Sequence, residues 1–179
     1  FSIQFFSRKV KNLIKNNKLP YRMMSEVLSL NNSQSEWFID RICKYYNYFY
    51  NPTTLTIWGL SFKGGTGDLR EAASLDVIEK LSIYKNLKIK IHDPQAAFEH
   101  FNVYEDFIIE KGRTEEDKYK TLEDSDGLII CNDWSLYKFS NFDLMKSKMK
   151  NLVIFDGKNL LEIDQLKFYG FKYYGIGVK

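Results

Sequence analysis

The sequence has few cysteines, no long apolar run and little net charge, and each absence excludes a class of protein. Only two cysteines, Cys43 and Cys131, occur in 179 residues. They lie far apart without a CxxC pair, which argues against a disulfide framework and against a metal site of zinc type. No apolar run approaches the roughly 20 residues that span a bilayer, and the start of the chain lacks the layout of a signal peptide. We expect a soluble, cytoplasmic protein with no membrane partner and no metal.

The charge and the composition narrow the possible classes of protein further. Lysine and arginine number 26 against 23 aspartates and glutamates, and the basic residues are dispersed. Nucleic-acid binding is therefore not expected, because it normally requires a concentrated basic surface. The chain is 44% hydrophobic and 16% aromatic, which suits one globular domain with an appendage. It begins at Phe1 rather than at methionine, so we expect a piece of a longer protein.

Apolar residues in the first 46 positions recur at steps of three and four, which predicts helices. Pro20 should break the pattern, so the second helix is predicted from about Tyr21 to Tyr46. A helix of that length with aromatic side chains is expected to pack against a partner. The residues expected in its core or interface are Trp37, Phe38 and Ile42.

Residues 47–54 are predicted to form a linker, after which the pattern changes to short apolar runs alternating with helices. We therefore expect a helical segment over residues 1–49 and an α/β domain over 50–179 with a doubly wound parallel sheet. The segment 101–120 is predicted to be a partly helical, solvent-facing excursion. The predicted strands are Leu55–Leu60, Leu87–His92, Leu128–Cys131, Leu152–Phe155 and Lys172–Ile176, and the predicted helices are Ala72–Tyr84, Asn141–Met149 and Ile163–Phe168.

The segment GLSFKGGTGDLREAAS, residues 59–74, places Lys63 and Arg70 on one glycine-rich turn between a strand and a helix. Ligands of α/β sheets gather at the carboxyl ends of strands, and a helix N-terminus favours anions, so this turn is a candidate anion site. It contains no Walker loop, and Arg70 stands where the dinucleotide fingerprint needs its third glycine. The alternative is a flexible turn with two solvated cations.

A second candidate segment, IFDGKNLL, ends the fourth apolar run and carries Lys158. Its alternative reading is an ordinary turn after a strand, since Asp-Gly favours turns. Asp93 has the spacing of a ribose-binding acid, yet before Pro94 it is predicted to be a turn former.

Three further side chains, those of His92, Cys131 and Asp133, are expected near the same edge of the sheet. Together they could suggest a thiol nucleophile with a base. We favour a buried strand cysteine and a hydrogen-bonded core histidine, because nothing in the sequence supplies an oxyanion site.

Both candidate segments resemble motifs in the C-terminal portion of the UDP-glucose/GDP-mannose dehydrogenase family. The second resembles the family's element [IV]-[FV]-D-G-R-N, with Lys158 in place of the arginine. Smaller matches on either side occur in the family's order, so the resemblance covers nearly the whole chain. The first segment matches the family pattern at Gly59, Phe62, Lys63, Thr66, Asp68, Arg70, Glu71 and Ser74.

The resemblance implies a Rossmann-like UDP-binding domain, preceded by a helical segment from the family's central dimerisation domain. It further implies UDP-glucose or a related nucleotide-sugar as the ligand, NAD as the cofactor, and a homodimer formed through the helix at 21–46. By the same resemblance, Phe62 and Lys63 contact the nucleotide-sugar, Arg70 reaches NAD on a neighbouring domain, and Lys158 contacts substrate. Lysine lacks the planar fork of arginine, so weaker or altered substrate binding is expected.

The resemblance breaks at the family's catalytic cysteine, which forms a thiohemiacetal during NAD-dependent oxidation of UDP-glucose to UDP-glucuronate. Alignment places Phe5 at that position, with Arg8 and Lys9 over the family's lysine and aspartate. We therefore expect no catalytic residue and no main NAD-binding domain in this chain, which would be the UDP-sugar-binding part of a UDP-glucose 6-dehydrogenase-like protein. One alternative is a non-catalytic nucleotide-sugar-binding or dimerisation module from a split or decayed gene. Another is an unrelated flavodoxin-like or Rossmann-like domain.

Overall fold

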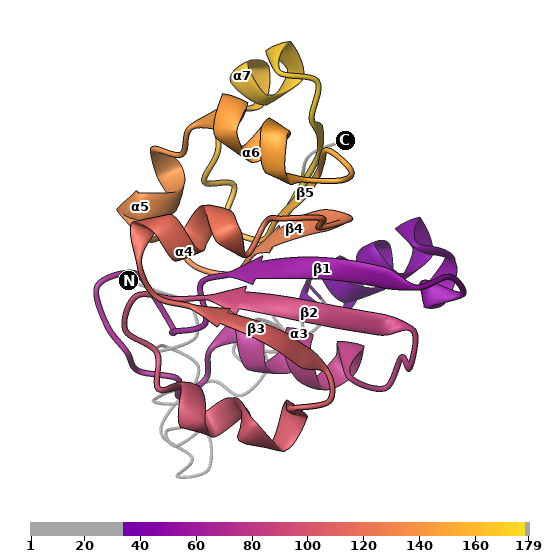
Figure 1. The fold of residues 1–179 in the computed structure, drawn as a ribbon, viewed down its shortest axis with the longest axis vertical. Coiled ribbons are helices and arrows are strands. Elements are labelled where there is room, and N and C mark those ends of the chain that lie inside the picture. The colour runs from indigo at the N-terminus through magenta and orange to yellow at the C-terminus, as the bar shows by residue number, and fades with distance from the viewer. Residues whose placement is uncertain (1–33, 178–179) are drawn as a thin grey trace, which may run out of the picture.

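The computed structural model describes residues 34–177, which contain a single sheet of six parallel strands in the order β3-β2-β1-β4-β5-β6 (Figure 1). The chain starts at the centre of the sheet, runs outward to one edge, and returns to build the other half. The predicted doubly wound α/β fold is confirmed, with its switch point between β1 and β4. The strands are β1 (Thr53–Trp58), β2 (Leu87–His92), β3 (Ile108–Gly112), β4 (Gly127–Ile130), β5 (Val153–Asp156) and β6 (Lys172–Gly175).

Short helices connect the strands, and a helix over residues 34–45 precedes them. Within residues 34–177, no helix has the length and apolarity to cross a membrane. The remaining helices are η1 (Asn47–Phe49), α3 (Ala73–Leu81), η2 (Phe98–Tyr104), α4 (Glu115–Lys120), α5 (Ser135–Lys138), α6 (Phe142–Lys148) and α7 (Ile163–Phe168).

The strand β3 was not predicted and corrects the interpretation of residues 101–120 as an excursion without sheet structure. The end of η2 and all of α4 lie in this segment, so its partly helical character is confirmed. The strand pairs only with β2, and as an edge strand it can carry charge: Glu110 forms an ion pair with Lys90 at 3.1 Å, and Ile109 is 53% exposed. The nearly continuous apolar run that identifies the central strands is therefore interrupted here.

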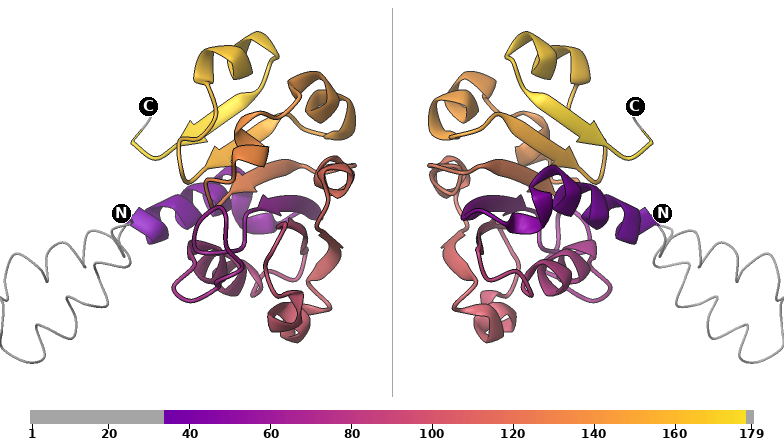
Figure 2. Two further views of the ribbon diagram at one scale, coloured as in Figure 1. Left: turned by 90° about the vertical axis from the view of Figure 1, so that its left-hand side faces the viewer. Right: turned by 90° about the vertical axis from the view of Figure 1, so that its right-hand side faces the viewer.

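Helices cover both faces of the sheet, so the central strands are apolar on both sides. Ile57 and Ile129 point to the face covered by α3 and the helix at 34–45, whereas Trp58 and Ile130 point to the face covered by α5, α6 and α7. Figure 2 shows the helix at 34–45 and α6 on opposite sides of the sheet. Each face has its own apolar core.

The helix at 34–45 shares a core with the sheet. Phe38 and Ile42 are 6% and 0% exposed within that core, as predicted for a core or interface role, whereas Trp37 is 47% exposed. The predicted start of this helix at Tyr21 lies outside the described residues. The chain then turns through η1, where the Phe49 side chain is buried, and enters β1 at Thr53.

Candidate functional site

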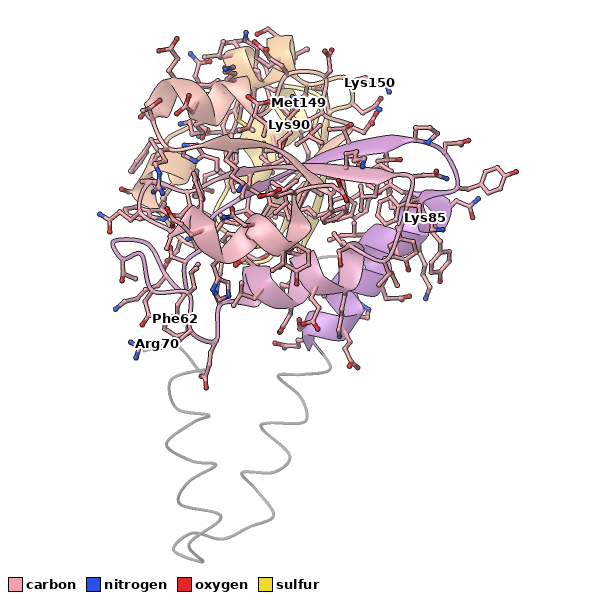
Figure 3. The ribbon with its side chains drawn as sticks, turned by 60° about the horizontal axis from the view of Figure 1, so that its bottom comes forward. Phe62, Arg70, Lys85, Lys90, Met149 and Lys150 are labelled. Atoms are coloured by element: carbon pink, nitrogen blue, oxygen red, sulfur yellow. The ribbon has the colours of Figure 1, made fainter. Side chains whose placement is uncertain are left out.

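The predicted site residues lie on loops at the carboxyl edge of the sheet. All strands are parallel, so the loops after β1, β2, β4 and β5 emerge at this edge, two of them flanking the switch point. The structure places Phe62, Lys63 and Arg70 on the loop after β1 and Lys158 on the loop after β5. Figure 3 shows Phe62 and Arg70 together at one corner of the molecule, far from Lys85, which precedes β2.

The loop after β1 is held by specific contacts, which argues against a flexible turn. It closes on itself where the Phe62 N–H donates to the Asp68 carbonyl at 2.7 Å. The Gly64 N–H donates to Asp133 Oδ1 at 2.8 Å, and a Cβ on Gly64 would lie 2.9 Å from Trp134 Cα. Glycine at position 64 therefore permits the close approach of the loops after β1 and β4.

Arg70 is oriented by a carboxylate two residues before it. Its Nε and Nη2 donate to Asp68 at 2.9 Å (Oδ1) and 2.6 Å (Oδ2), and these hydrogen bonds lower the pKa of Asp68 to about 2. The Arg70 side chain is 78% exposed, so the pair adds little to stability. Its effect is to fix the direction of the guanidinium, whose remaining N–H groups face solvent.

Lys63 and Lys158 present exposed ammonium groups at this edge. Among residues 34–177, no carboxylate forms an ion pair with either of them. Phe62 is half-buried beside Lys63. The edge therefore offers two unneutralised cations and an aromatic ring, a combination suited to a phosphorylated ligand with a planar group.

Asp93, at the end of β2, joins three of the loops. Its side chain is 0% exposed and accepts seven hydrogen bonds between 2.8 and 3.3 Å. Burial alone would raise the pKa of Asp93, but the backbone N–H donors outweigh it, so the pKa lies below its ordinary value. The donors are the backbone N–H groups of Leu60, Ser61, Gln95 and Ala96, the Ser61 hydroxyl, the Asn132 amide and the Trp134 indole.

Asp156 has a similar role at the end of β5. Its carboxylate accepts from the backbone N–H groups of Lys158 at 2.9 Å and Leu160 at 2.7 Å, and from the Tyr173 hydroxyl at 3.1 Å. Asn159 follows in a left-handed conformation with φ +51°. The turn chemistry predicted for Asp156-Gly157 is therefore present, and it supports the backbone from which Lys158 projects.

The UDP binding domain model of the UDP-glucose/GDP-mannose dehydrogenase family matches residues 56–163, the segment that carries all of these loops. The chain belongs to this family.

Curated relatives cover nearly the whole of this chain. UDP-glucose 6-dehydrogenase from Rickettsia bellii is 27% identical over 95% of this chain and 38% of its own length. UDP-glucose 6-dehydrogenase from Pseudomonas aeruginosa is 29% identical over 87% of this chain and 34% of its own length. The chain thus spans little more than a third of these relatives.

Solved structures agree on the fold. A UDP-glucose dehydrogenase from the archaeon Pyrobaculum islandicum superposes with a TM-score of 0.70 at 19% identity, covering 94% of this chain and 35% of that structure. The fold is therefore that of the UDP-binding domain of this dehydrogenase family, as the sequence resemblance predicted.

Within this family member, the interpretation of His92 and Cys131 as core residues is confirmed. His92 is 0% exposed, and its Nε2 lies 2.8 Å from the Thr114 carbonyl. Cys131 is 5% exposed, and burial raises the pKa of its thiol to about 12 while the charge of Lys158 acts in the opposite direction. A thiol with this pKa is a poor nucleophile. Asp133 contacts the loop after β1 and not the thiol.

The free energy of unfolding is expected to fall as the pH decreases below about 6.5, because of His92. Burial lowers the pKa of His92 from 6.5, outweighing the opposing Thr114 contact, so the unfolded chain takes up a proton first as the pH falls. Urea unfolding at about pH 7.5 and about pH 5.5 measures this slope. His92→Gln should flatten it, and the exposed His100→Gln should leave it unchanged; equal slopes in all three proteins would contradict the assignment.

Sequence reasoning missed the joining role of Asp93 and of Asn132, which is 0% exposed and donates to the Ser61 hydroxyl at 3.0 Å. Asp93 was correctly identified as a turn former, since its Oδ1 accepts from Gln95 N–H at 2.9 Å. The available signal was position: Asp93 follows β2 directly and Asn132 lies two residues after β4, so both stand at the carboxyl edge of the sheet. Position alone does not reveal which carboxylate accepts from which loop.

Proposed function

We propose that the carboxyl edge binds the UDP part of a nucleotide-sugar, with UDP-glucose as the preferred ligand. The observation that carries this proposal is that the family match over residues 56–163 includes both cation-bearing loops, which emerge at one edge of the sheet. Phe62 and Lys63 contact the nucleotide-sugar from one loop, and Lys158 contacts it from the other. The exposed ammonium groups then pair with the diphosphate or the sugar.

In the same proposal, Arg70 faces NAD held by another domain of the whole protein. The residues fit this role, because Asp68 occupies only part of the Arg70 guanidinium and leaves N–H groups free for an anion. NAD, when bound, accepts hydride from the sugar alcohol. Arg70 would orient the cofactor and neutralise its phosphate charge.

The activity proposed for the whole protein is NAD-dependent oxidation of UDP-glucose to UDP-glucuronate, with the nucleophile and the main NAD site outside residues 34–177. The assignment of Phe5 to the nucleophile position lies outside the described residues. This assignment also supports the alternative proposal, a non-catalytic nucleotide-sugar-binding module. Single-turnover assays of NADH formation by the whole protein with UDP-glucose and NAD distinguish the two: formation of NADH would contradict the non-catalytic alternative.

Millimolar UDP is expected to raise the thermal unfolding midpoint of this chain by several degrees, because a ligand bound only to the native state stabilises it. Lys63→Ala should weaken UDP binding about tenfold or more through loss of a charged contact, and should reduce the shift accordingly. The matched control is Lys85→Ala, which removes an exposed lysine far from this edge. Equal shifts in the two variants would contradict the site, as would the absence of a shift in the unmodified chain.

Lys158→Arg is expected to tighten UDP-sugar binding about threefold to tenfold, because the planar guanidinium can make two parallel hydrogen bonds to phosphate or sugar oxygens. Calorimetric titration of the two proteins with UDP-glucose measures the change. Lys158→Ala should weaken binding. If the alanine and arginine variants bind like the unmodified chain, Lys158 does not contact the ligand.

We also propose the division into a helical segment of a dimerisation domain at 1–49 and a UDP-sugar-binding domain at 50–179, with a homodimer formed through the helix at 21–46. In the described part of that helix, Trp37 remains 47% exposed and stacks on the Arg41 guanidinium at 5.0 Å, so one face remains available. Sedimentation at micromolar concentration tests the dimer. A strict monomer would contradict it.

A further inference from the structure

Three loops of the proposed site meet on the buried carboxylate of Asp93. Its Oδ2 accepts from the Leu60 and Ser61 backbone N–H groups at 2.8 and 3.0 Å, at the start of the loop after β1. The same oxygen accepts from the Asn132 amide and the Trp134 indole, both 3.3 Å away on the loop after β4. One oxygen atom thus connects the two loops that flank the switch point.

The first of these loops carries the proposed ligand contacts. Ser61 immediately precedes Phe62 and Lys63, so the two backbone hydrogen bonds to Asp93 fix the direction in which these residues leave the sheet. Ser61 is 2% exposed; its hydroxyl donates to Asp93 at 2.9 Å and accepts from the Asn132 amide at 3.0 Å. A small displacement of Asp93 would therefore move Ser61 and, through it, the neighbouring Phe62.

The other Asp93 oxygen fixes its own loop. Oδ1 accepts from the Gln95 and Ala96 N–H groups, both at 2.9 Å. Within residues 34–177, no lysine or arginine forms an ion pair with Asp93, and N–H and O–H dipoles alone stabilise its charge. An amide in this place would turn an NH₂ group toward several donors, so the site requires a carboxylate.

We propose that Asp93 is the positioning residue of the UDP site, holding Phe62 and Lys63 in place for the nucleotide-sugar and coupling their loop to Trp134. The inference rests on the proposed function. Asp93 is itself buried and acts on the ligand only through the loop. The Trp134 indole signal reports whether the loop after β1 is held in place, because the indole N–H donates to Asp93 while the Trp134 backbone packs against Gly64.

The test compares Asp93→Asn with the unmodified chain by ¹H–¹⁵N NMR and by calorimetric titration with UDP, both well below the unfolding temperature. The sequence has three tryptophans, so Trp37→Phe and Trp58→Phe assign the Trp134 indole signal. We expect UDP to bind Asp93→Asn at least tenfold more weakly. The Phe62 and Lys63 amide signals and the Trp134 indole signal should shift in the variant without UDP.

The matched control is Asp126→Asn at the opposite edge of the sheet. Asp126 is also buried, at 7% exposure, and accepts from the Thr54 backbone N–H at 2.9 Å and the Asn151 amide at 2.9 Å. This variant should lose stability but keep its affinity for UDP within twofold and its Trp134 signal unchanged. If Asp126→Asn weakens UDP binding as much as Asp93→Asn, general destabilisation explains both, and the positioning role is overturned.

The remaining outcomes are also decisive. A folded Asp93→Asn with unshifted loop signals overturns the proposal. If the unmodified chain does not bind UDP, the proposed function fails, while the shifts of the Phe62, Lys63 and Trp134 signals still decide whether Asp93 positions the loop. If Asp93→Asn does not fold, Ser61→Ala removes one donor to Oδ2 and should weaken UDP binding about threefold; unchanged affinity and loop signals in that variant overturn the role.

Discussion

Replacing Gly59 with alanine is expected to lower the free energy of unfolding by about 3 kcal/mol or more, by combining backbone strain with steric overlap. Gly59 follows β1 with φ +87°, a left-handed conformation that costs alanine about 1–2 kcal/mol. An added Cβ would also overlap the buried amide of Asn132, which cannot move without breaking its bonds to Ser61 and Asp93. Urea unfolding of the two proteins measures the difference.

Gly65→Ala provides the matched control. Gly65 has a similar φ of +84°, but an added Cβ there would meet no atom within 4 Å. Its cost should therefore be the backbone strain alone, about 1–2 kcal/mol. In the background of Asn132→Ala, the additional penalty of Gly59→Ala should shrink, since the overlapping amide is gone. If Gly59→Ala and Gly65→Ala cost the same, the overlap with Asn132 does not contribute.

The central strands could be predicted from the sequence because they bury apolar side chains on both faces of the sheet and therefore form short apolar runs. The range Leu87–His92 was predicted without error, and the other predicted strands were displaced by at most two residues at either end. The edge strand β3 could not be predicted, because pairing on one side lets Glu110 and Lys111 occupy a strand. The helix α3 ends at Leu81, before the predicted end at Tyr84, and beyond Leu81 the Ile83 side chain is 72% exposed and adds nothing to the core.

The position of the candidate site could be predicted from the sequence, but the hydrogen bonds that hold its loops together could not. The parallel sheet predicted from the alternation of strands and helices brings the loops that carry Lys63 and Lys158 to one edge. The hydrogen bonds that hold the loops depend on side chains far apart in sequence, as when Asn132 reaches Ser61 across 71 positions. Such pairings follow from tertiary packing, and a single sequence contains no periodic signal for them.

Replacing Ile42 with alanine is expected to lower the free energy of unfolding by about 3–4 kcal/mol, the usual cost of removing a large buried aliphatic side chain. Ile42 is 0% exposed in the core that the helix at 34–45 shares with α3 and the sheet. The rings of Tyr45 in the same helix and of Tyr46 directly after it lie 5.6 and 6.1 Å from that of Phe155 on β5, so the surrounding core has little freedom to collapse into the cavity.

Ile83→Ala is the matched control, because it makes the same chemical change at a side chain that is 72% exposed, two residues after α3. Its cost should stay within about 0.5 kcal/mol. A large cost for Ile42→Ala alone would mean that the helix at 34–45 packs on the UDP-binding domain and stabilises it across the proposed boundary at residue 50. A chain shortened to residues 50–179 should then be less stable than the unmodified chain. Equal, small costs at both positions would contradict this and favour an independent domain from Tyr50.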